Sequence, residues 1–243
     1  MMDDAINIRG LKRVAADFAG EVEPPACAPS TGKRIAVLGG GPGGLSAAYY
    51  LQLMGHQTTV YEMLPKLGGM LRYGIPNYRL PKERLDEDIQ AILDTGVEVQ
   101  YGKRIGDDLT IQQLREEGFK AFYVAIGAQG GRKAGVPGED ADGVKTGVEF
   151  LRSVNLDEST KLSGRTVVVG GGNVAMDAAR TAKRLGAEVH VVYRRGEEEL
   201  PARQGRGGVH HAKEEGIIFD LLQNPTELLV DENGCVKGAR VIK

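Results

Sequence analysis

A glycine loop between a short apolar strand and a helix constrains this chain more than any other stretch. Residues 34–45 read Arg-Ile-Ala-Val-Leu-Gly-Gly-Gly-Pro-Gly-Gly-Leu, and Gly39, Gly41 and Gly44 have the spacing of a dinucleotide-binding fingerprint. The first glycine allows a tight turn, the second lets the backbone approach a pyrophosphate, and the third lets the helix pack on the strand. Glu62 closes the next predicted strand about 20 residues on, where a carboxylate meets a ribose hydroxyl.

The same pattern recurs roughly 130 residues further along the chain. A predicted strand runs into the loop 170–175, which reads Gly-Gly-Gly-Asn-Val-Ala, and a predicted helix and strand follow. Ala175 stands in place of the third glycine, a variation that the fingerprint allows. Arg194 and Arg195 close this second copy, where a carboxylate closes the first. The chain therefore contains an internal duplication of the strand–loop–helix–strand unit.

The residues that close the two copies predict different ligands. A carboxylate such as Glu62 accepts hydrogen bonds from the hydroxyls of an unmodified adenosine ribose and repels a 2′-phosphate. Two guanidinium groups suit a 2′-phosphate, because arginine offers forked donors and a permanent positive charge. The first loop therefore fits FAD or NAD(H), and the second fits NADP(H). The competing interpretation of Arg194 and Arg195 is a solvated basic turn paired with the glutamates at 197–199.

Composition excludes several other classes of function. The 243 residues carry a net charge of −2, which argues against a nucleic-acid or anionic-membrane partner. No apolar run approaches the ~20 residues of a membrane span, and the N-terminus lacks a signal-peptide pattern. Cys27 and Cys235 form neither a C-x-x-C pair nor a metal-ligand cluster, so we expect a cytoplasmic protein without a metal site. The adjacent His210 and His211 point about 100° apart on a helix and do not share a ligand face.

The remaining stretches predict an α/β fold with two Rossmann-like dinucleotide-binding domains, built on central parallel sheets in a three-layer architecture. An amphipathic helical segment over 2–18 and a proline-rich linker over 21–32 come first. Capping boxes at Thr110 and Thr146 predict two helix starts. The residue pattern also predicts helices over 45–54 and 176–185 and a strand over 121–126. We expect three parts: an N-terminal helix and linker (1–33), an FAD-binding domain (34–145) and an inserted NAD(P)H-binding domain (146–243).

The two loops and the segment between them resemble one family of flavoproteins. That segment reads Gly-Gly-Met-Leu-Arg-Tyr-Gly-Ile-Pro over 68–76, and the second copy reads Gly-Gly-Gly-Asn-Val-Ala-Met-Asp over 170–177. The family is that of the small subunit of NADPH-dependent glutamate synthase, with the flavin half of dihydropyrimidine dehydrogenase and the flavin subunit of electron-bifurcating ferredoxin:NADP oxidoreductases. The opening stretch 6–12 is similar to the family's segment that follows its iron–sulfur domain.

The resemblance implies a set of cofactor contacts. The FAD pyrophosphate would lie on the first loop, the adenosine ribose at Glu62, the flavin along the segment from Gly69, and the NADPH 2′-phosphate at Arg194 and Arg195. The implied cofactor-binding residues are Gly39, Gly41, Pro42, Gly43, Gly44, Glu62, Gly69, Met70, Leu71, Arg72, Gly127, Gly170, Gly172, Asn173, Val174, Ala175, Arg194 and Arg195.

Two departures from the family pattern qualify this expectation. Family members begin with a cysteine-rich segment that binds iron–sulfur clusters, and this chain has no such cysteines, so we expect these clusters only in a partner or in a missing segment. They also return to the FAD domain through a closing strand with a Gly-Asp pair, before which this chain stops. The sequence is therefore expected to be a fragment or module whose FAD domain is incomplete.

The leading hypothesis is an FAD-dependent NAD(P)H oxidoreductase module, similar to the glutamate synthase small subunit. Hydride would pass from NADPH, or from NADH, to FAD, and electrons would continue to an iron–sulfur or amidotransferase-type redox subunit. No acid, base or nucleophile is assigned, because no triad pattern surrounds Ser46 or the four histidines. One alternative is a non-catalytic nucleotide-binding or scaffold subunit. A disulfide-reductase-like flavoprotein is disfavoured, since it requires a redox cysteine pair.

Overall fold

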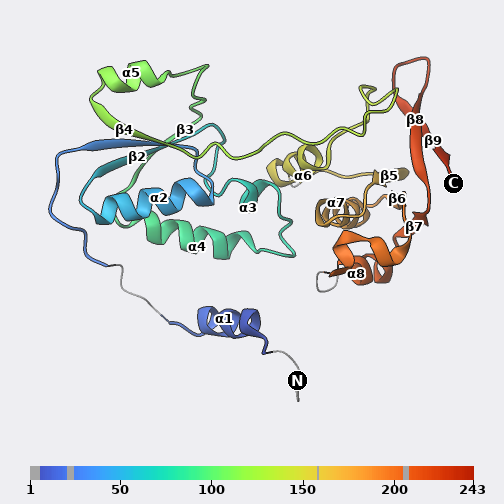
Figure 1. The fold of residues 1–243 in the computed structure, drawn as a ribbon, viewed down its shortest axis with the longest axis horizontal. Helices are drawn as coiled ribbons and strands as arrows, with labels where there is room; N and C mark the ends of the chain where they lie inside the picture. The colour runs from blue at the N-terminus through green and yellow to red at the C-terminus, as the bar shows by residue number, and fades with distance from the viewer. Residues whose placement is uncertain (1–5, 21–24, 158, 205–207) are drawn as a thin grey trace.

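The computed structural model describes residues 6–20, 25–157, 159–204 and 208–243. Most of them form two units, each built on a parallel sheet (Figure 1). The predicted N-terminal helix appears as α1 (Ile8–Asp17), while the expectation for residues 2–5 lies outside the described residues. No residue of α1 is buried. Of the predicted linker, residues 25–32 run along the first sheet unit, where Ala28 N donates to Leu53 O and Thr31 N to Gly55 O.

The first unit contains a four-stranded parallel sheet in the order β3-β2-β1-β4. Its elements are β1 (Arg34–Leu38), α2 (Pro42–Leu53), β2 (Gln57–Glu62), α3 (Met70–Tyr73), α4 (Lys82–Leu93), β3 (Glu98–Tyr101), α5 (Ile111–Glu116) and β4 (Phe119–Val124). This order places the carboxyl ends of β1 and β2 side by side, at the edge of the sheet where dinucleotides bind in doubly wound folds.

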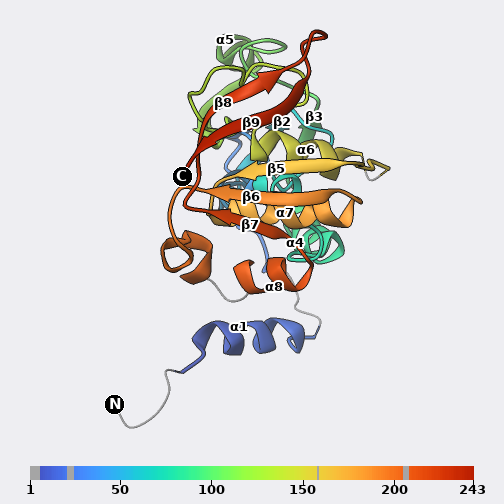
Figure 2. The same cartoon turned by 90° about the vertical axis from the view of Figure 1, so that its right-hand side faces the viewer.

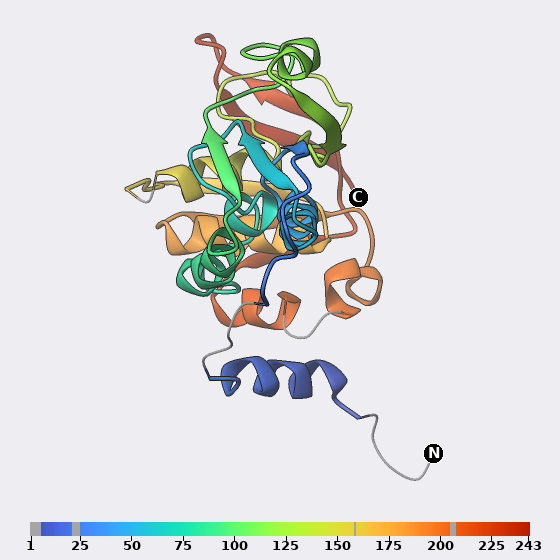
Figure 3. The ribbon, with the colours of Figure 1, turned by 90° about the vertical axis from the view of Figure 1, so that its left-hand side faces the viewer.

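Helices cover both faces of this sheet, as Figure 1 and Figure 3 show. Alternate residues of β1 point to opposite faces. Val37 packs with Leu45 of α2 and Leu85 of α4, whereas Leu38 packs with Leu114 of α5 on the other face. The first unit therefore has the three layers that the sequence predicts.

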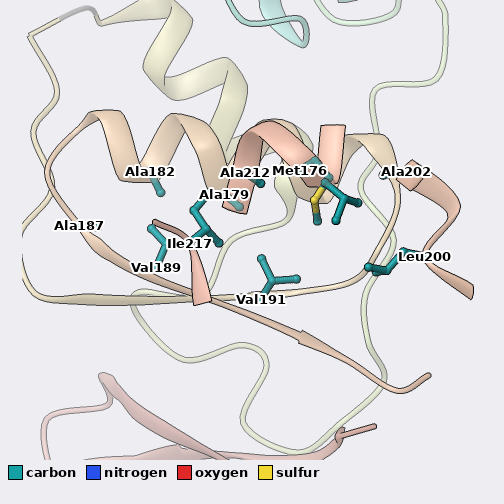
Figure 4. Packing of buried hydrophobic residues seen from close by; sticks show 11 residues of the cluster. Met176, Ala179, Ala182, Ala187, Val189, Val191, Leu200, Ala202, Ala212 and Ile217 are labelled. Carbon is teal, nitrogen blue, oxygen red and sulfur yellow. The ribbon is translucent and has the colours of Figure 1, made fainter. Parts of the chain in front are cut away.

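The second unit contains a three-stranded parallel sheet in the order β5-β6-β7 (Figure 2). Its elements are α6 (Gly147–Leu156), β5 (Arg165–Val169), α7 (Asn173–Arg184), β6 (Glu188–Tyr193), the 3-10 turns η1 (Glu197–Glu199) and η2 (Pro201–Gln204), α8 (Gly208–Glu214), β7 (Ile218–Leu221), and the antiparallel pair β8 (Asn224–Val230) and β9 (Val236–Ile242). Figure 4 shows its core, where Val189 and Val191 of β6 face Ala179 of α7 and Ala212 of α8.

The connection between the units packs against the β8–β9 hairpin. Leu228 N donates to Pro137 O, and Val236 N donates to Asp142 O. Thr146 then caps α6 through a capping box with Glu149, as the sequence predicts. The fold class is confirmed. The domain boundary expected between residues 145 and 146 lies immediately before this cap and stays a prediction.

Three predicted elements were displaced by two or three residues. Helix α2 was expected from residue 45 and α7 from residue 176, but both begin three residues earlier, because the last glycine of the motif's Gly-x-Gly pair already accepts the first helical hydrogen bond. Strand β4 was expected at 121–126 and spans 119–124, because its pairing with β1 begins at Phe119, which is buried in the core.

Candidate functional site

Two of the three motif glycines in the first loop are required by the fold itself. Gly39 has φ of +110°, and a Cβ there would overlap the carbonyl oxygen of Ala125 at the end of β4. A Cβ at Gly44 would overlap the carbonyl oxygen of Gly39 and lie 3.2 Å from Val37 Cγ1. These contacts give Gly39 the tight turn and Gly44 the close helix–strand packing that the fingerprint requires.

Gly41 is different, because the fold gives no reason for a glycine there. Its φ of −78° and ψ of −179° suit any residue, and the nearest atom to an added Cβ is Gly69 Cα at 3.7 Å. Gly41 is the N-cap of α2 and has no side chain with which to cap the helix, and Pro42 follows at the first position. The amides of Gly43 and Gly44 therefore stay available to an anion at the helix N-terminus.

A cleft of about 620 Å³ opens over this loop. Its walls come from the ends of β1, β2 and β4, from the segment after β3 and from the start of α3. The lining residues are Leu38, Gly39, Gly41, Pro42, Gly43, Tyr61, Glu62, Met63, Leu64, Gly69, Met70, Lys103, Arg104, Ile105, Tyr123, Val124, Ala125, Ile126, Gly127 and Gln129. Eight residues of the predicted FAD set thus share one cleft.

Glu62 is held firmly at this cleft. Its side chain is buried, and its two carboxylate oxygens accept hydrogen bonds from Gly40 N and Leu64 N, each at 2.8 Å. Each carboxylate oxygen has two acceptor positions, so one position on each oxygen is left for further donors. Such a fixed pair of acceptors suits the two hydroxyls of a ribose.

Leu71 and Arg72 lie behind the cleft wall. Leu71 packs against the core between the sheet and α4, and the buried Arg72 donates to Leu67 O and pairs with Asp86. Neither residue lines the cleft, whereas Gly69 and Met70 do. The expected contact of Leu71 and Arg72 with a flavin stays a prediction.

Sequence reasoning missed two cations that line the cleft, Lys103 and Arg104. They directly follow β3, which pairs with β2, and Lys103 N donates to Glu62 O. Their position just after a predicted strand could have indicated this, because the carboxyl ends of parallel strands meet at one edge of a sheet. Arg104 also pairs with Asp107 at 3.3 Å, so Lys103 and a partly neutralised Arg104 bring positive charge to a cleft whose buried acid is Glu62.

The second loop repeats the geometry of the first. Gly170 has φ of +137°, and its N–H donates to Val192 O of β6. Gly172 is the N-cap of α7, and nothing lies within 4 Å of a Cβ added to it. Asn173, Val174 and Ala175 form the first turn of α7, so their amides point out of the helix N-terminus.

Arg194 and Arg195 lie beside this loop and are exposed. A Cβ at Gly171 would come within 2.9 Å of the Tyr193 ring, so the loop packs directly on the residue that precedes the two arginines. Within the described part of the chain neither guanidinium has an ion pair, and Lys213 Nζ pairs with Glu197 at 2.7 Å. The described contacts therefore show no pairing of the two arginines with the glutamates at 197–199, and the assignment of Arg194 and Arg195 to a 2′-phosphate stays a prediction.

The other polar clusters of the described residues show no arrangement for a metal ion. No group of three His, Cys, Asp or Glu residues in the described ranges is arranged to hold a metal ion, and none of the helices described is long and apolar enough to cross a membrane. Cys27 and Cys235 are free and exposed. His190 on β6 bonds Asp220 at 2.8 Å and Glu188 at 3.1 Å, and the hydrogen bond to Asp220 raises the pKa of His190.

Comparison with curated proteins identifies several relatives. The whole chain is 42% identical to the NADP(+)-dependent formate dehydrogenase subunit beta of Moorella thermoacetica and 41% identical to the NADPH-Fe(3+) oxidoreductase subunit beta of Geobacter sulfurreducens, and it spans 38% and 37% of those proteins. It is 32% identical to the glutamate synthase [NADPH] small chain of Escherichia coli over 98% of this chain and 53% of that one. The resemblance drawn from the sequence is confirmed.

Solved structures show the same fold at low identity. FprA of Mycobacterium tuberculosis in complex with NADPH has a TM-score of 0.63 at 20% identity, covering 88% of this chain and 67% of FprA. Thioredoxin reductase of Lactococcus lactis has a TM-score of 0.58 at 22% identity, covering 86% and 70%. Residues 33–242 match the family model of the pyridine nucleotide-disulphide oxidoreductases. The chain, with its two dinucleotide loops, belongs to the pyridine nucleotide-disulphide oxidoreductase family.

Proposed function

We propose that this chain is the FAD- and NAD(P)H-binding part of an oxidoreductase built like the glutamate synthase small subunit. The observation that carries this proposal is the contrast between the two loops. Glu62 is buried and fixed in the cleft over the first loop, whereas Arg194 and Arg195 are exposed beside the second. The first loop thus selects an unphosphorylated ribose, and the second selects a 2′-phosphate.

The cleft fits the adenosine and pyrophosphate of FAD. Gly41 leaves open space where a pyrophosphate would approach, and the amides of Gly43 and Gly44 would donate to it. Glu62 would accept hydrogen bonds from the ribose, while Gly69 and Met70 would form the wall beside the flavin. FAD bound there would supply two-electron chemistry, because a flavin can take up a hydride from a reduced nicotinamide and give up the two electrons singly to an acceptor while the proton goes to solvent.

The second loop would hold the nicotinamide nucleotide. Gly172 leaves space for the pyrophosphate at the amides of Asn173 and Val174, and Arg194 and Arg195 would pair with the 2′-phosphate. An iron–sulfur or amidotransferase-type subunit as electron acceptor follows from the resemblance. The names of the formate dehydrogenase and NADPH-Fe(3+) relatives, which both denote subunits, support assembly with another chain.

Absorption spectroscopy tests the proposal. Purified protein should show a flavin band, or acquire one on adding FAD, and the band should bleach when NADPH is added without oxygen. Colourless protein that binds NADPH alone would favour the alternative, a non-catalytic nucleotide-binding or scaffold subunit.

The nucleotide preference is tested with Arg194→Ala. A hydrogen bond to a charged group contributes about 1.5–3 kcal/mol, and the exposure of Arg194 favours the lower end, so we expect a roughly tenfold weaker NADPH affinity. NADH affinity should stay unchanged, because NADH has no 2′-phosphate. Lys213→Ala is the matched control, since Lys213 is a nearby cation already paired with Glu197. Equal losses for NADPH and NADH would contradict the assignment.

A further inference from the structure

One short segment connects the cleft wall of the first unit to a helix of the second. It begins at Gly69 and Met70, which line the cleft, and passes through α3 to Tyr78 and Arg79. Arg79 lies 98 residues from its partner Asp177 in the sequence, so the contact between them joins the two units.

The first half of this segment is fixed to the first unit. The Tyr73 hydroxyl accepts from Lys66 N at 3.0 Å and donates to Lys66 O at 3.1 Å. Lys82 Nζ donates to Leu71 O at 2.9 Å and to Ile75 O at 2.6 Å. These bonds hold the carbonyl end of α3, so the segment moves with the cleft wall.

The second half contacts α7. Arg79 Nη1 donates to both carboxylate oxygens of Asp177, at 2.8 and 2.9 Å. The Tyr78 ring lies 4.5 Å from the guanidinium carbon of Arg180 and 4.0 Å from that of Arg184, within the range of cation–π attraction. We call these five residues the joint.

The charged groups of the joint are held in place by neighbouring side chains. The Asp177 side chain is 10% exposed, and among the described residues Arg79 is its hydrogen-bond partner. The Arg79 side chain is 47% exposed, so removing Arg79 would leave the buried Asp177 carboxylate without its partner, which is unfavourable, whereas Arg79 without Asp177 is still solvated by water. Arg180 and Arg184 are themselves held by Glu215, the residue that follows α8, at 2.8 and 2.7 Å. The Tyr78 ring therefore packs on cations that are already fixed.

Asp177 also lies close to the second loop. It is four residues after Asn173, so both lie on the same face of α7, one turn apart. A helix is stiff over so short a distance, and Asn173 is where the helix meets its ligand in the proposed function. The joint therefore links the wall beside one cofactor to the helix start beside the other.

We propose that Tyr78 and Arg79 are positioning residues, which set the distance and orientation between the two bound nucleotides by holding α7 against the first unit. The expected effect on the rate of hydride transfer rests on the proposed function. The fixed orientation of the two units does not. The segment Met70–Arg79 is then a rigid connection, and the Arg79–Asp177 pair and the Tyr78 ring keep the second unit in one orientation.

The chain's own cysteines allow a direct structural test. It contains two, both exposed: Cys27 on the first unit, where its Sγ lies 3.6 Å from Thr95 O, and Cys235 in the hairpin that follows β7. Nitroxide labels on both report the distance between the units by double electron–electron resonance. We expect one narrow distance distribution in the unmodified chain and a broadened or shifted one in Asp177→Asn and in Tyr78→Leu.

Each variant has a reason and a control. Asp177→Asn keeps the side-chain shape but removes the charge, and Tyr78→Leu keeps an apolar side chain but removes the ring. Glu87→Gln is the matched control, because it breaks an exposed ion pair with Arg84 inside α4. Far-UV circular dichroism establishes which variants fold, and either joint variant alone is sufficient for the distance measurement.

Kinetics supply the second readout. If hydride passes between the nucleotides, the rate of flavin bleaching at saturating NADPH should fall roughly ten- to hundredfold in the joint variants, because an error of about 1 Å in placement has that effect. The dissociation constant for NADPH should not change, since no joint residue belongs to the first turn of α7 or to the pair Arg194 and Arg195, where the nucleotide is proposed to bind.

The possible outcomes separate the two proposals. Distance distributions that stay unchanged in both folded joint variants would overturn the positioning role, whatever the rates. A loss confined to NADPH affinity would overturn it as well. An unmodified chain that binds no flavin would refute the proposed function alone, because the distance measurement needs no cofactor.

Discussion

Replacing single glycines by alanine should separate ligand binding from folding in this protein. Gly41 and Gly44 lie three residues apart at the start of α2, yet an added methyl group meets different surroundings at each. At Gly41 it points into the cleft, with Gly69 Cα at 3.7 Å as its nearest neighbour. At Gly44 it overlaps the carbonyl oxygen of Gly39.

The magnitudes follow from these contacts. Gly41 has a backbone conformation that alanine adopts freely, which favours alanine by about 0.4–1 kcal/mol through the unfolded state. Glycine is the better N-cap residue by a similar amount, so Gly41→Ala should change the free energy of unfolding by less than about 0.5 kcal/mol. Gly44→Ala forces α2 away from β1, and such overpacking typically lowers the free energy of unfolding by about 1–3 kcal/mol. The Gly41→Ala methyl group would occupy the space proposed for the pyrophosphate, and we expect at least ~1.4 kcal/mol, or tenfold, weaker FAD binding.

The assay combines denaturant unfolding with flavin titration. Each variant is unfolded in urea without cofactor, and FAD binding is followed by the change in flavin fluorescence. Gly172→Ala is the parallel experiment on the second loop, where nothing lies within 4 Å of an added Cβ, and it should weaken NADPH binding but not FAD binding.

Two results would refute this reasoning. Gly41→Ala that loses as much stability as Gly44→Ala would mean that the glycine at position 41 serves the fold. Gly41→Ala that is stable and binds FAD with full affinity would mean that no pyrophosphate approaches the first loop.

Two further predictions concern charged side chains. Glu62→Gln replaces one acceptor oxygen by an NH₂ group that cannot accept from Gly40 N or Leu64 N. The free energy of unfolding, measured in urea, should fall by about 1.5–3 kcal/mol, and FAD binding should weaken. An unchanged unfolding curve would contradict this prediction. His190 has a raised pKa, so its bonds to Asp220 and Glu188 should stabilise the fold fully below about pH 6.5 and lose effect as pH rises through the raised pKa. The stability gap to His190→Gln should shrink over that range, and a gap independent of pH would argue against this.

The local elements of this fold could be predicted from the sequence because their causes are local. The capping boxes at Thr110 and Thr146 form as expected, since each needs only residues three positions apart. The strands β1 and β2 and both glycine loops follow from short apolar runs and glycine spacing. Helix starts were missed by three residues, because the helices already begin at residues that the motif presents as a loop.

The sequence by itself determined that the chain has two dinucleotide loops and that an acid closes one and two arginines close the other. Only the tertiary structure decided which neighbours complete each site. It brought Lys103 and Arg104 to the cleft, placed Arg72 behind the cleft wall, and paired Arg79 with Asp177. The physical reason is range: glycine conformation and helix capping act over a few residues, whereas these contacts depend on how sheets and helices far apart in the chain pack together.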